Sequence, residues 1–199
     1  MRKQRFVLDT SAFTGLNKSK KEINKHILEM IKLISKAKDA GITCYTPPSV
    51  WEEIKHLLEN KGISKRSINS LDAWLVQKTP SKAELMIPAA FMYEYIGEVR
   101  NRINKGLREA EKAVIKTKHK PESHAKVIKE LRNNYREKMR QGMVDSKEDL
   151  DVLLLAKELN AGIVASDEGI KKWAKEWGIR FIDSEAFPRL LKEYIKKVS

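Results

Sequence analysis

The sequence is poor in cysteine, with Cys44 as its single thiol. One cysteine cannot form an intramolecular disulfide or a cysteine-based zinc site, so a disulfide-stapled secreted scaffold and a zinc finger are both excluded. Long apolar runs are also missing, since no window approaches the ~18 apolar residues of a membrane-spanning helix. The charged first residues do not resemble a signal peptide. We therefore expect a cytoplasmic protein with no membrane partner.

Several motifs of common enzyme classes are absent. The sequence contains no Walker loop, no GxGxxG and no GxSxG. These motifs build phosphate-binding loops and serine nucleophiles, so hydrolysis of nucleoside triphosphates and serine chemistry have no support. The 4 histidines show no spacing typical of metal ligands.

Negative charge is in deficit, because 27 Asp and Glu stand against 40 Lys and Arg and leave a net charge of +13. The composition, 41% hydrophobic and 34% charged, is that of a soluble globular chain. A surplus of positive charge most often indicates an anionic partner, and nucleic acid is the commonest, because Lys and Arg replace counterions along the phosphates. A well-solvated thermophilic surface would give the same composition, and charge alone does not separate the two.

Strands and helices alternate near both ends of the chain. Apolar runs at 5–10, 42–47, 162–167 and 179–184 predict strands, and apolar residues at helical spacing predict helices between and after them. Ser49-x-x-Glu52 has the spacing of a capping box and predicts the start of the helix after the second strand. This alternation predicts an α/β fold, a parallel sheet covered by helices.

The middle of the chain has a different pattern. Residues 61–143 show no convincing strand and predict a helical insertion between 1–60 and 144–199, which together form the core. Within the insertion, 98–143 predicts a projecting hairpin of two helices broken at His119-Lys120-Pro121. This hairpin holds 14 Lys and Arg against 6 acidic residues, and thus +8 of the net +13.

Sparse apolar residues along the hairpin predict a seam between its two helices. They are Val99, Ile103, Leu107, Ala110, Val114, Val127, Ile128, Leu131 and Tyr135. A narrow apolar tip would also suit self-association, and the alternative is a packed arm with a solvated basic face.

The acidic residues are the informative ones in this basic chain. Asp9 and Asp167 each end a predicted strand, and Asp149 opens the helix before the strand that Asp167 ends. Ligands of open parallel sheets bind beyond the carboxyl ends of the strands, where the strand order reverses. Asp145 lies four residues before Asp149 and shares its face if the helix reaches back that far. Glu53 lies in the first turns of the helix after the second strand. We expect these acids to gather at one edge of the sheet.

Carboxylates gathered in one place repel one another unless a cation neutralises them. Oxygen ligands without a nearby Cys or His pair favour Mg²⁺ or Mn²⁺ over zinc. Such a site in a basic protein predicts phosphodiester hydrolysis, in which a metal-activated water attacks phosphorus.

Each of these acids has an ordinary structural alternative. Asp9, Asp145 and Asp167 could each cap a helix or turn, and Ser146 could take the place of Asp145. The coincidence of all four aspartates, rather than any single spacing, favours the metal site. Glu52 competes with Glu53, which we prefer because Glu52 belongs to the predicted capping box.

Two further acids are weaker candidates. Asp151 is about 200° around the helix from Asp149, so we expect it to be solvated rather than a ligand. Glu168 follows Asp167 directly, and we expect it to be exposed or to support the site indirectly.

The segments VLDTSAF, PPSVWEE and DLDVLLLAKELNAGIVASDEG, with the closing strand, resemble a PIN domain nuclease over residues 5–60 and 144–197. The resemblance implies a PIN-like, Rossmann-like sheet and a ribonuclease that depends on Mg²⁺ or Mn²⁺. It implies metal binding by Asp9, Asp149 and Asp167, with Glu53 as an accessory acid.

A PIN core interrupted by a basic two-helix projection, and followed by MVDSKEDLDVLLLAKEL, is similar to the homologues of Aquifex ribonuclease P. These are protein-only enzymes that remove the 5′ leader from precursor tRNA and leave a 5′-phosphate on the tRNA. The resemblance adds Asp145 to the catalytic set and Asp151 and Glu168 as accessory acids, although we would expect aspartate in place of Glu168. It also implies a homo-oligomer built through the hairpin, with dimers assembled into a larger ring such as a dodecamer.

Basic residues of the hairpin are the expected contacts to the RNA backbone, and they are Arg100, Arg102, Lys105, Arg108 and Lys112. Three other functions stay open. A PIN toxin is generally shorter and lacks the hairpin. An RNA-binding scaffold or partner protein would not need four mutually repelling carboxylates, and a DNA-binding protein would explain the charge but not the acids.

Overall fold

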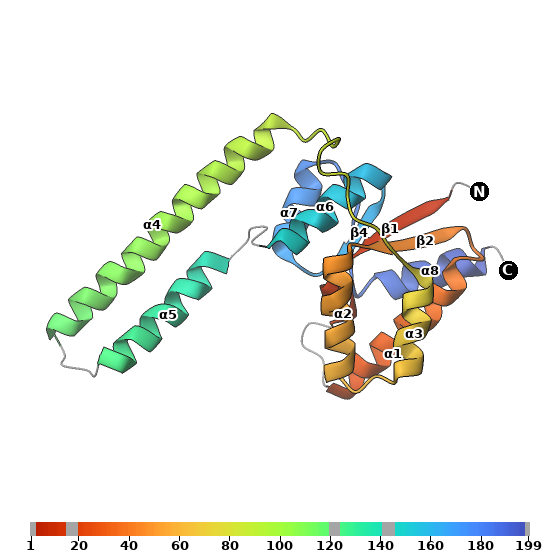
Figure 1. The fold of residues 1–199 in the computed structure, drawn as a ribbon, viewed down its shortest axis with the longest axis horizontal. Coiled ribbons are helices and arrows are strands. Elements are labelled where there is room, and N and C mark those ends of the chain that lie inside the picture. Colours follow the sequence, from red (N-terminus) through yellow and green to blue (C-terminus); the bar gives the residue numbers. More distant parts are fainter. Residues whose placement is uncertain (1–2, 15–19, 120–123, 141–145, 198–199) are drawn as a thin grey trace. The chain divides into compact units, whose positions relative to one another are not determined.

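The computed structural model describes residues 3–14, 20–119, 124–140 and 146–197 (Figure 1). The chain divides into two compact units, Met1–Leu85 with Ser146–Ser199 and Met86–Asp145. We call the first the sheet unit and the second the arm. In the part of the chain that the structure describes, no helix is long and apolar enough to cross a membrane.

The sheet unit alternates strands and helices. Its elements, in chain order, are β1 (Gln4–Leu8), the 3-10 turn η1 (Thr10–Phe13), α1 (Lys20–Ala37), β2 (Ile42–Thr46), α2 (Pro48–Asn60), α3 (Lys65–Trp74), β3 (Leu75–Gln77), α6 (Lys147–Leu159), β4 (Gly162–Ala165), α7 (Glu168–Glu176), β5 (Phe181–Asp183) and α8 (Phe187–Lys196). The arm consists of α4 (Ala89–His119) and α5 (His124–Arg140). The predicted α/β fold with an inserted basic helical hairpin is confirmed.

All neighbouring strands of the sheet pair in parallel, in the order β3-β2-β1-β4-β5. On one face α6 packs against β1, β4 and α7, and on the other α1 packs against α3 and α8 (Figure 1). β1 is central and covered on both faces, which explains its continuous apolar run: Phe6, Val7 and Leu8 are at most 1% exposed.

The expectation of a helical stretch without a strand over 61–143 was wrong at β3. This strand is three residues long, and only Leu75 of the three is buried. So short a strand at the sheet edge has no alternating pattern to detect, and the pairing of Leu75 with Cys44 of β2 defines it instead.

The strand order reverses between β1 and β4, because β2 and β3 follow on one side of β1 while β4 and β5 lie on the other. Leu8 is in register with Val164, and the Asp9 N–H donates to the Val164 carbonyl at 3.1 Å. The carboxyl ends of β1 and β4 therefore lie side by side at the point where open α/β sheets bind their ligands.

The arm is a helical hairpin in which α4 and α5 pack against each other. The Tyr135 ring lies directly over Gly106, where an added Cβ would overlap it. The buried stripe of α4 carries Arg102 and Glu109, at 7% and 9% exposure, whereas Ile103 and Leu107 are each 58% exposed. The predicted apolar seam was therefore wrong at Ile103, Leu107 and Val114, whereas Val99 and Ala110 are half-buried, because close approach at Gly106 turns a different stripe toward α5.

Candidate active site

Asp9 stands directly after β1 and is the most buried of the predicted site acids that the structure describes, at 7% exposure. Its Oδ2 accepts a hydrogen bond from the Ser11 N–H at 2.9 Å, which caps η1. Burial raises the pKa of Asp9 above its ordinary 3.8, hydrogen bonds from Ser11 and Thr10 oppose the shift, and the negative charge of Asp167 adds to it. A cation placed between the two aspartates would offset the cost of burying the Asp9 charge and the repulsion between the two carboxylates.

Asp167 follows β4 and is the N-cap of α7, where its Oδ1 accepts from the Ile170 N–H at 2.9 Å. The capping interpretation is thus correct for both Asp9 and Asp167. Capping does not compete with a role in the predicted acidic site, because the cap hydrogen bond fixes each carboxylate at the carboxyl end of its strand. Each cap hydrogen bond engages one named oxygen of its carboxylate.

Serine side chains connect the ends of three strands. The Ser11 hydroxyl oxygen accepts from the Ser166 N–H at 2.7 Å, and the Ser166 and Ser184 hydroxyls bond to each other. Ser184 is 1% exposed. These contacts fix the ends of β1, β4 and β5 relative to one another, and with them the spacing of Asp9 and Asp167. Sequence reasoning missed these residues, although each follows a strand within one or two positions of an aspartate.

Glu53 reaches the same edge from α2. The Thr10 hydroxyl donates to Glu53 Oε2 at 2.9 Å, so this carboxylate lies beside the residue that follows Asp9. The predicted capping box was wrong, because α2 begins at Pro48 after Pro47, whose side chain makes no cap hydrogen bond. Proline at the first helical position supplies the start signal instead.

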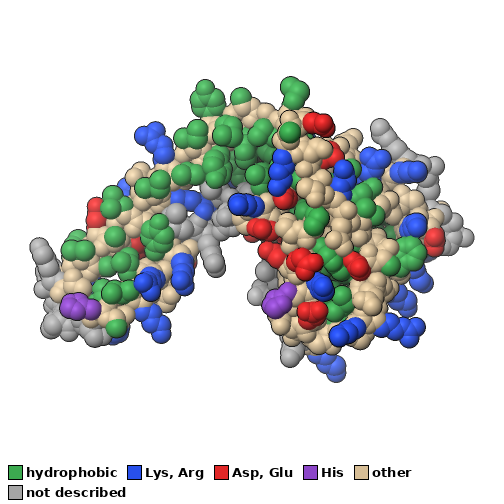
Figure 2. Space-filling model, viewed as in Figure 1, with side chains coloured by type: hydrophobic (Ala, Val, Ile, Leu, Met, Phe, Trp, Pro, Cys, Tyr) green, Lys and Arg blue, Asp and Glu red, His purple; other side chains and the backbone are tan. Residues whose placement is uncertain are grey.

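Asp149 lies in the first turn of α6, and its N–H donates to the Oγ of the N-cap Ser146 at 3.0 Å. A short turn connects α6 to β4, so the helix runs opposite to that strand and its first turn lies near the strand's carboxyl end. Figure 2 shows acidic side chains gathered on the sheet unit over the amino-terminal ends of α2 and α6. Asp145 lies outside the described residues.

The structure assigns Asp151 a different role from the expected one. Asp151 is 8% exposed and forms an ion pair with Lys82 at 2.8 Å, so the expectation of a solvated side chain was wrong. The segment after β3 crosses α6 at this point, and Glu158 accepts from the Ser81 N–H at 2.8 Å. Asp151 therefore attaches this segment to α6.

Glu168 has a side chain that is 74% exposed, and it pairs with Lys171 at 2.9 Å. This agrees with the expected exposed position.

The donor set fits a hard divalent cation in its chemistry. Every candidate ligand is a carboxylate oxygen, and Asp9 is buried near the charge of Asp167. Within the described ranges, no three His, Cys, Asp or Glu side chains already form a metal-sized cluster. The site as described is an acidic edge with fixed strand ends.

The basic residues predicted on the arm divide into two groups. Arg100, Lys105 and Arg108 are exposed, and Lys112, also exposed, pairs with Glu109 at 2.7 Å. Arg102 is only 7% exposed, so the expectation that it faces RNA was wrong: it lies on the stripe that α4 buries.

The chain is similar to known proteins over nearly its whole length. Residues 5–196 match the family model described as PINc domain ribonuclease. A protein of Haloarcula marismortui named RNA-free ribonuclease P is 42% identical over 97% of this chain and 92% of the relative. Proteins of the same name are 44% identical in Archaeoglobus fulgidus, over 98% of this chain and 92% of the relative, and 43% identical in Methanocaldococcus jannaschii, over 98% and 94%.

Proposed function

We propose, since the chain belongs to the family of PINc domain ribonucleases, that this endoribonuclease removes the 5′ leader of precursor tRNA without an RNA subunit. The relatives named RNA-free ribonuclease P support this substrate, because their similarity extends through the arm as well as the sheet unit. The observation that carries the proposal is the convergence of Asp9 and Asp167 where the strand order reverses.

In this proposal Asp9, Asp149 and Asp167 hold Mg²⁺ or Mn²⁺ at the carboxyl edge of the sheet, and Asp145 completes the acidic set. A divalent cation there would supply neutralisation of the phosphate charge and activation of the attacking water. Hydrolysis then leaves a 5′-phosphate on the mature tRNA and a 3′-hydroxyl on the leader.

The protein's own groups position these acids. The Ser11 N–H holds one oxygen of Asp9, and the Ile170 N–H holds one oxygen of Asp167, so neither carboxylate rotates freely. Glu53 accepts a hydrogen bond from the Thr10 hydroxyl. It acts as an accessory acid that orients η1 beside Asp9. Preorganisation of this kind lowers the cost of assembling the site around the phosphate.

The arm supplies the remaining contacts in this proposal. Exposed Arg100, Lys105 and Arg108 hold phosphates of the folded tRNA by charge and shape, with Lys112 sharing its charge with Glu109. Arg102 is left out because it is buried.

The arm also forms a homo-oligomer in this proposal. Figure 2 shows hydrophobic side chains on the arm surface, and α4 exposes Ile103, Leu107 and Val114 at 58%, 58% and 61%. Single apolar side chains at a surface are ordinary, but a stripe along one helix suits a second copy of the chain. We propose dimers through this stripe, assembled into a larger ring. The substrate and the single buried thiol of Cys44 both fit a cytoplasmic enzyme.

The experiment is cleavage of a 5′-labelled precursor tRNA by the purified protein, with Mg²⁺ or with EDTA, and mapping of the cut. We expect one magnesium-dependent cut at the mature 5′ end, with a 5′-phosphate on the tRNA product. Scattered cuts would indicate a general PIN ribonuclease. Tight binding without any cut would indicate an RNA-binding partner protein, and either result would overturn the proposed function.

A further inference from the structure

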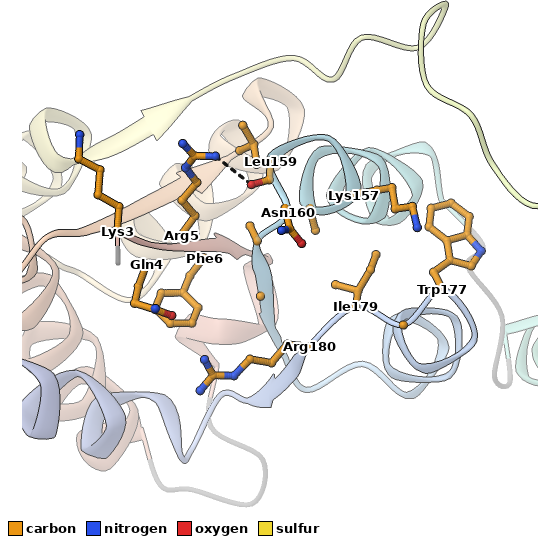
Figure 3. Close-up of a pocket in the computed structure, with 14 residues that line it drawn as sticks. Lys3, Gln4, Arg5, Phe6, Lys157, Leu159, Asn160, Trp177, Ile179 and Arg180 are labelled. Carbon is orange, nitrogen blue, oxygen red and sulfur yellow. Dashed lines mark hydrogen bonds between the residues drawn. The ribbon is translucent and has the colours of Figure 1, made fainter. Parts of the chain in front are cut away.

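A second feature of the sheet unit lies at the opposite edge of the sheet, away from the acids. It is a cavity of about 540 Å³ formed by the amino-terminal end of β1, the ends of α6 and α7, and the residues that lead into β4 and β5 (Figure 3). Its uncharged lining residues include Phe6, Ala161, Gly162 and Ile179. The proposed reaction does not use this cavity.

Among the described residues, four cationic side chains and no carboxylate line the cavity. They are Lys3, Arg5, Lys157 and Arg180. Figure 3 shows that they come from different segments: Lys3 and Arg5 from the start of β1, Lys157 from the end of α6, and Arg180 from the residues that lead into β5. Like charges that share a cavity repel one another, so this lining favours an anionic occupant.

Protein contacts hold two of these cations. Arg5 donates from Nη1 to the Leu159 carbonyl at 3.1 Å, and the Arg180 guanidinium lies 5.7 Å from the centre of the Phe6 ring. Both contacts leave other guanidinium N–H groups to donate, because arginine carries five. A preplaced guanidinium suits phosphate, since its planar fork can donate two parallel hydrogen bonds.

The ends of two helices at this cavity would disfavour an anion if their last carbonyls were unpaired. Several of them are paired: the Asn160 and Ala161 N–H groups donate to the Ala156 and Lys157 carbonyls at the end of α6. At the end of α7, the Ile179 N–H donates to the Ala174 carbonyl at 2.7 Å. Backbone capping thus reduces the negative potential at the helix ends, and each full positive charge of the lining exceeds the roughly half charge of a helix end.

Further lysines connect the cavity with the acidic edge. An open hollow of about 420 Å³ lies along α7 and is lined by Glu168, Lys171, Lys172 and Lys175. Ile179 lines both this hollow and the cavity. Lys171, Lys172 and Lys175 therefore place positive side chains along α7 between the acidic edge and the cavity, and Lys171 shares its charge with Glu168. A row of lysines between two sites of the same unit suits a polyanion better than a small anion.

We propose that the cavity binds a backbone phosphate of the RNA, remote from the bond that is cut. This inference rests on the proposed function for the identity of the RNA. At ~3.3 Å per residue, Arg5 lies about 13 Å from Asp9 along β1. A stacked strand with a phosphate every ~3.4 Å spans that distance with roughly four nucleotides. The cavity is thus an anchor that sets the direction of the strand as it leaves the acidic edge.

The test compares RNA binding by a Lys157→Gln/Arg180→Gln double variant with that by the wild type. Fluorescence anisotropy in EDTA, which prevents cleavage, gives the Kd for precursor tRNA and for a single-stranded RNA at several salt concentrations. We expect the Kd to rise about tenfold at moderate salt, and the slope of log Kd against log salt to fall by about 0.7, the value for one lost phosphate contact.

The matched control is Lys32→Gln/Lys36→Gln, which removes two positive charges from exposed positions on α1. The proposal is overturned if the cavity variant binds both RNAs as the control does. A titration with inorganic pyrophosphate, followed by thermal unfolding, identifies the source of the anion. If pyrophosphate stabilises the wild type but not the cavity variant, and both bind RNA equally well, the cavity binds a small phosphate. This result would overturn the RNA assignment.

Failure of the proposed function is distinguishable from failure of this inference. The proposed function fails if wild-type protein with Mg²⁺ does not cut precursor tRNA at the mature 5′ end. The binding comparison is made without metal and with a second RNA, so it decides the role of the cavity whatever the cleavage result.

Discussion

The hydroxyl oxygen of Ser11 accepts a hydrogen bond from the backbone N–H of Ser166 at 2.7 Å, across 155 positions of the chain. Ser11 also holds Asp9 through its own N–H, and Ser166 directly precedes Asp167. One serine thus fixes both aspartates at the end of neighbouring strands.

Replacing this serine tests that link. Ser11→Ala leaves the Ser166 N–H without its acceptor, so we expect the free energy of unfolding to fall by about 1–2 kcal/mol. We also expect the cleavage rate of precursor tRNA to fall at least tenfold at a temperature where the variant is folded, because the spacing of the aspartates loosens. Ser11→Thr retains the hydroxyl and should recover most of the rate. Equal rates for Ser11→Ala and the wild type would contradict the link.

We expect Asp9 to lower the free energy of unfolding of the metal-free protein, although the proposed reaction needs its carboxylate. Burial raises the pKa of Asp9, so in metal-free buffer the folded state keeps a proton that the unfolded state has lost. The free energy of unfolding therefore falls as the pH rises from about 4 through the raised pKa, and it stays lower above that window.

Asp9→Asn removes this titration. In EDTA at pH 7 we expect the variant to be more stable by about 1 kcal/mol, or roughly 2–4 °C in Tm, yet inactive with Mg²⁺. Added Mg²⁺ should stabilise the wild type more than the variant, since a ligand that binds only the folded state shifts the equilibrium. Thermal unfolding of both proteins in EDTA and in Mg²⁺ measures these differences. A lower Tm for the variant in EDTA would contradict the expected cost of burying the Asp9 charge.

Glu53 and Glu52 offer a matched pair of substitutions, since both are exposed residues of α2 but the Thr10 hydroxyl donates to Glu53. Glu53→Gln keeps an acceptor and removes the charge, so we expect a 5- to 50-fold slower cleavage. Glu52→Gln should change the rate less than twofold. If both variants cleave equally fast, Glu53 has no accessory role.

The apolar stripe of the arm predicts an oligomer. Ile103→Glu/Leu107→Glu places two charges on the exposed face of α4 and should reduce the molar mass measured by light scattering toward that of the 22.9 kDa monomer. Asn101→Glu/Asn104→Glu adds the same charge at exposed polar positions of α4 and should not. A wild type that is already monomeric at micromolar concentration would contradict the proposed assembly.

The parallel sheet was predictable because strands buried on both faces have long apolar runs, as Phe6–Leu8 does. The position of Asp9 and Asp167 followed from topology, since both end strands that flank the reversal of strand order. Neither inference needed side-chain detail.

Other features depend on tertiary contacts that sequence patterns do not contain. Asp151 is buried because a segment some 70 positions earlier in the chain brings Lys82 to it. Arg102 is buried because Tyr135 approaches Gly106 and selects the packed face of α4. The serine contacts between strand ends were missed for the same reason, since Ser166 and Ser184 meet only after the sheet has formed.

The central claim is that the acids at the carboxyl edge cut the RNA, and two positions of α6 test it most directly. Asp149 lies in the first turn at that edge, whereas Asp151, two residues later, pairs with Lys82. The measurement is the single-turnover rate of precursor tRNA cleavage at the mature 5′ end with Mg²⁺. We predict at least a 100-fold loss for Asp149→Asn and less than a 5-fold loss for Asp151→Asn, both checked to be folded. An Asp149→Asn variant that cleaves within twofold of the wild-type rate would contradict the account.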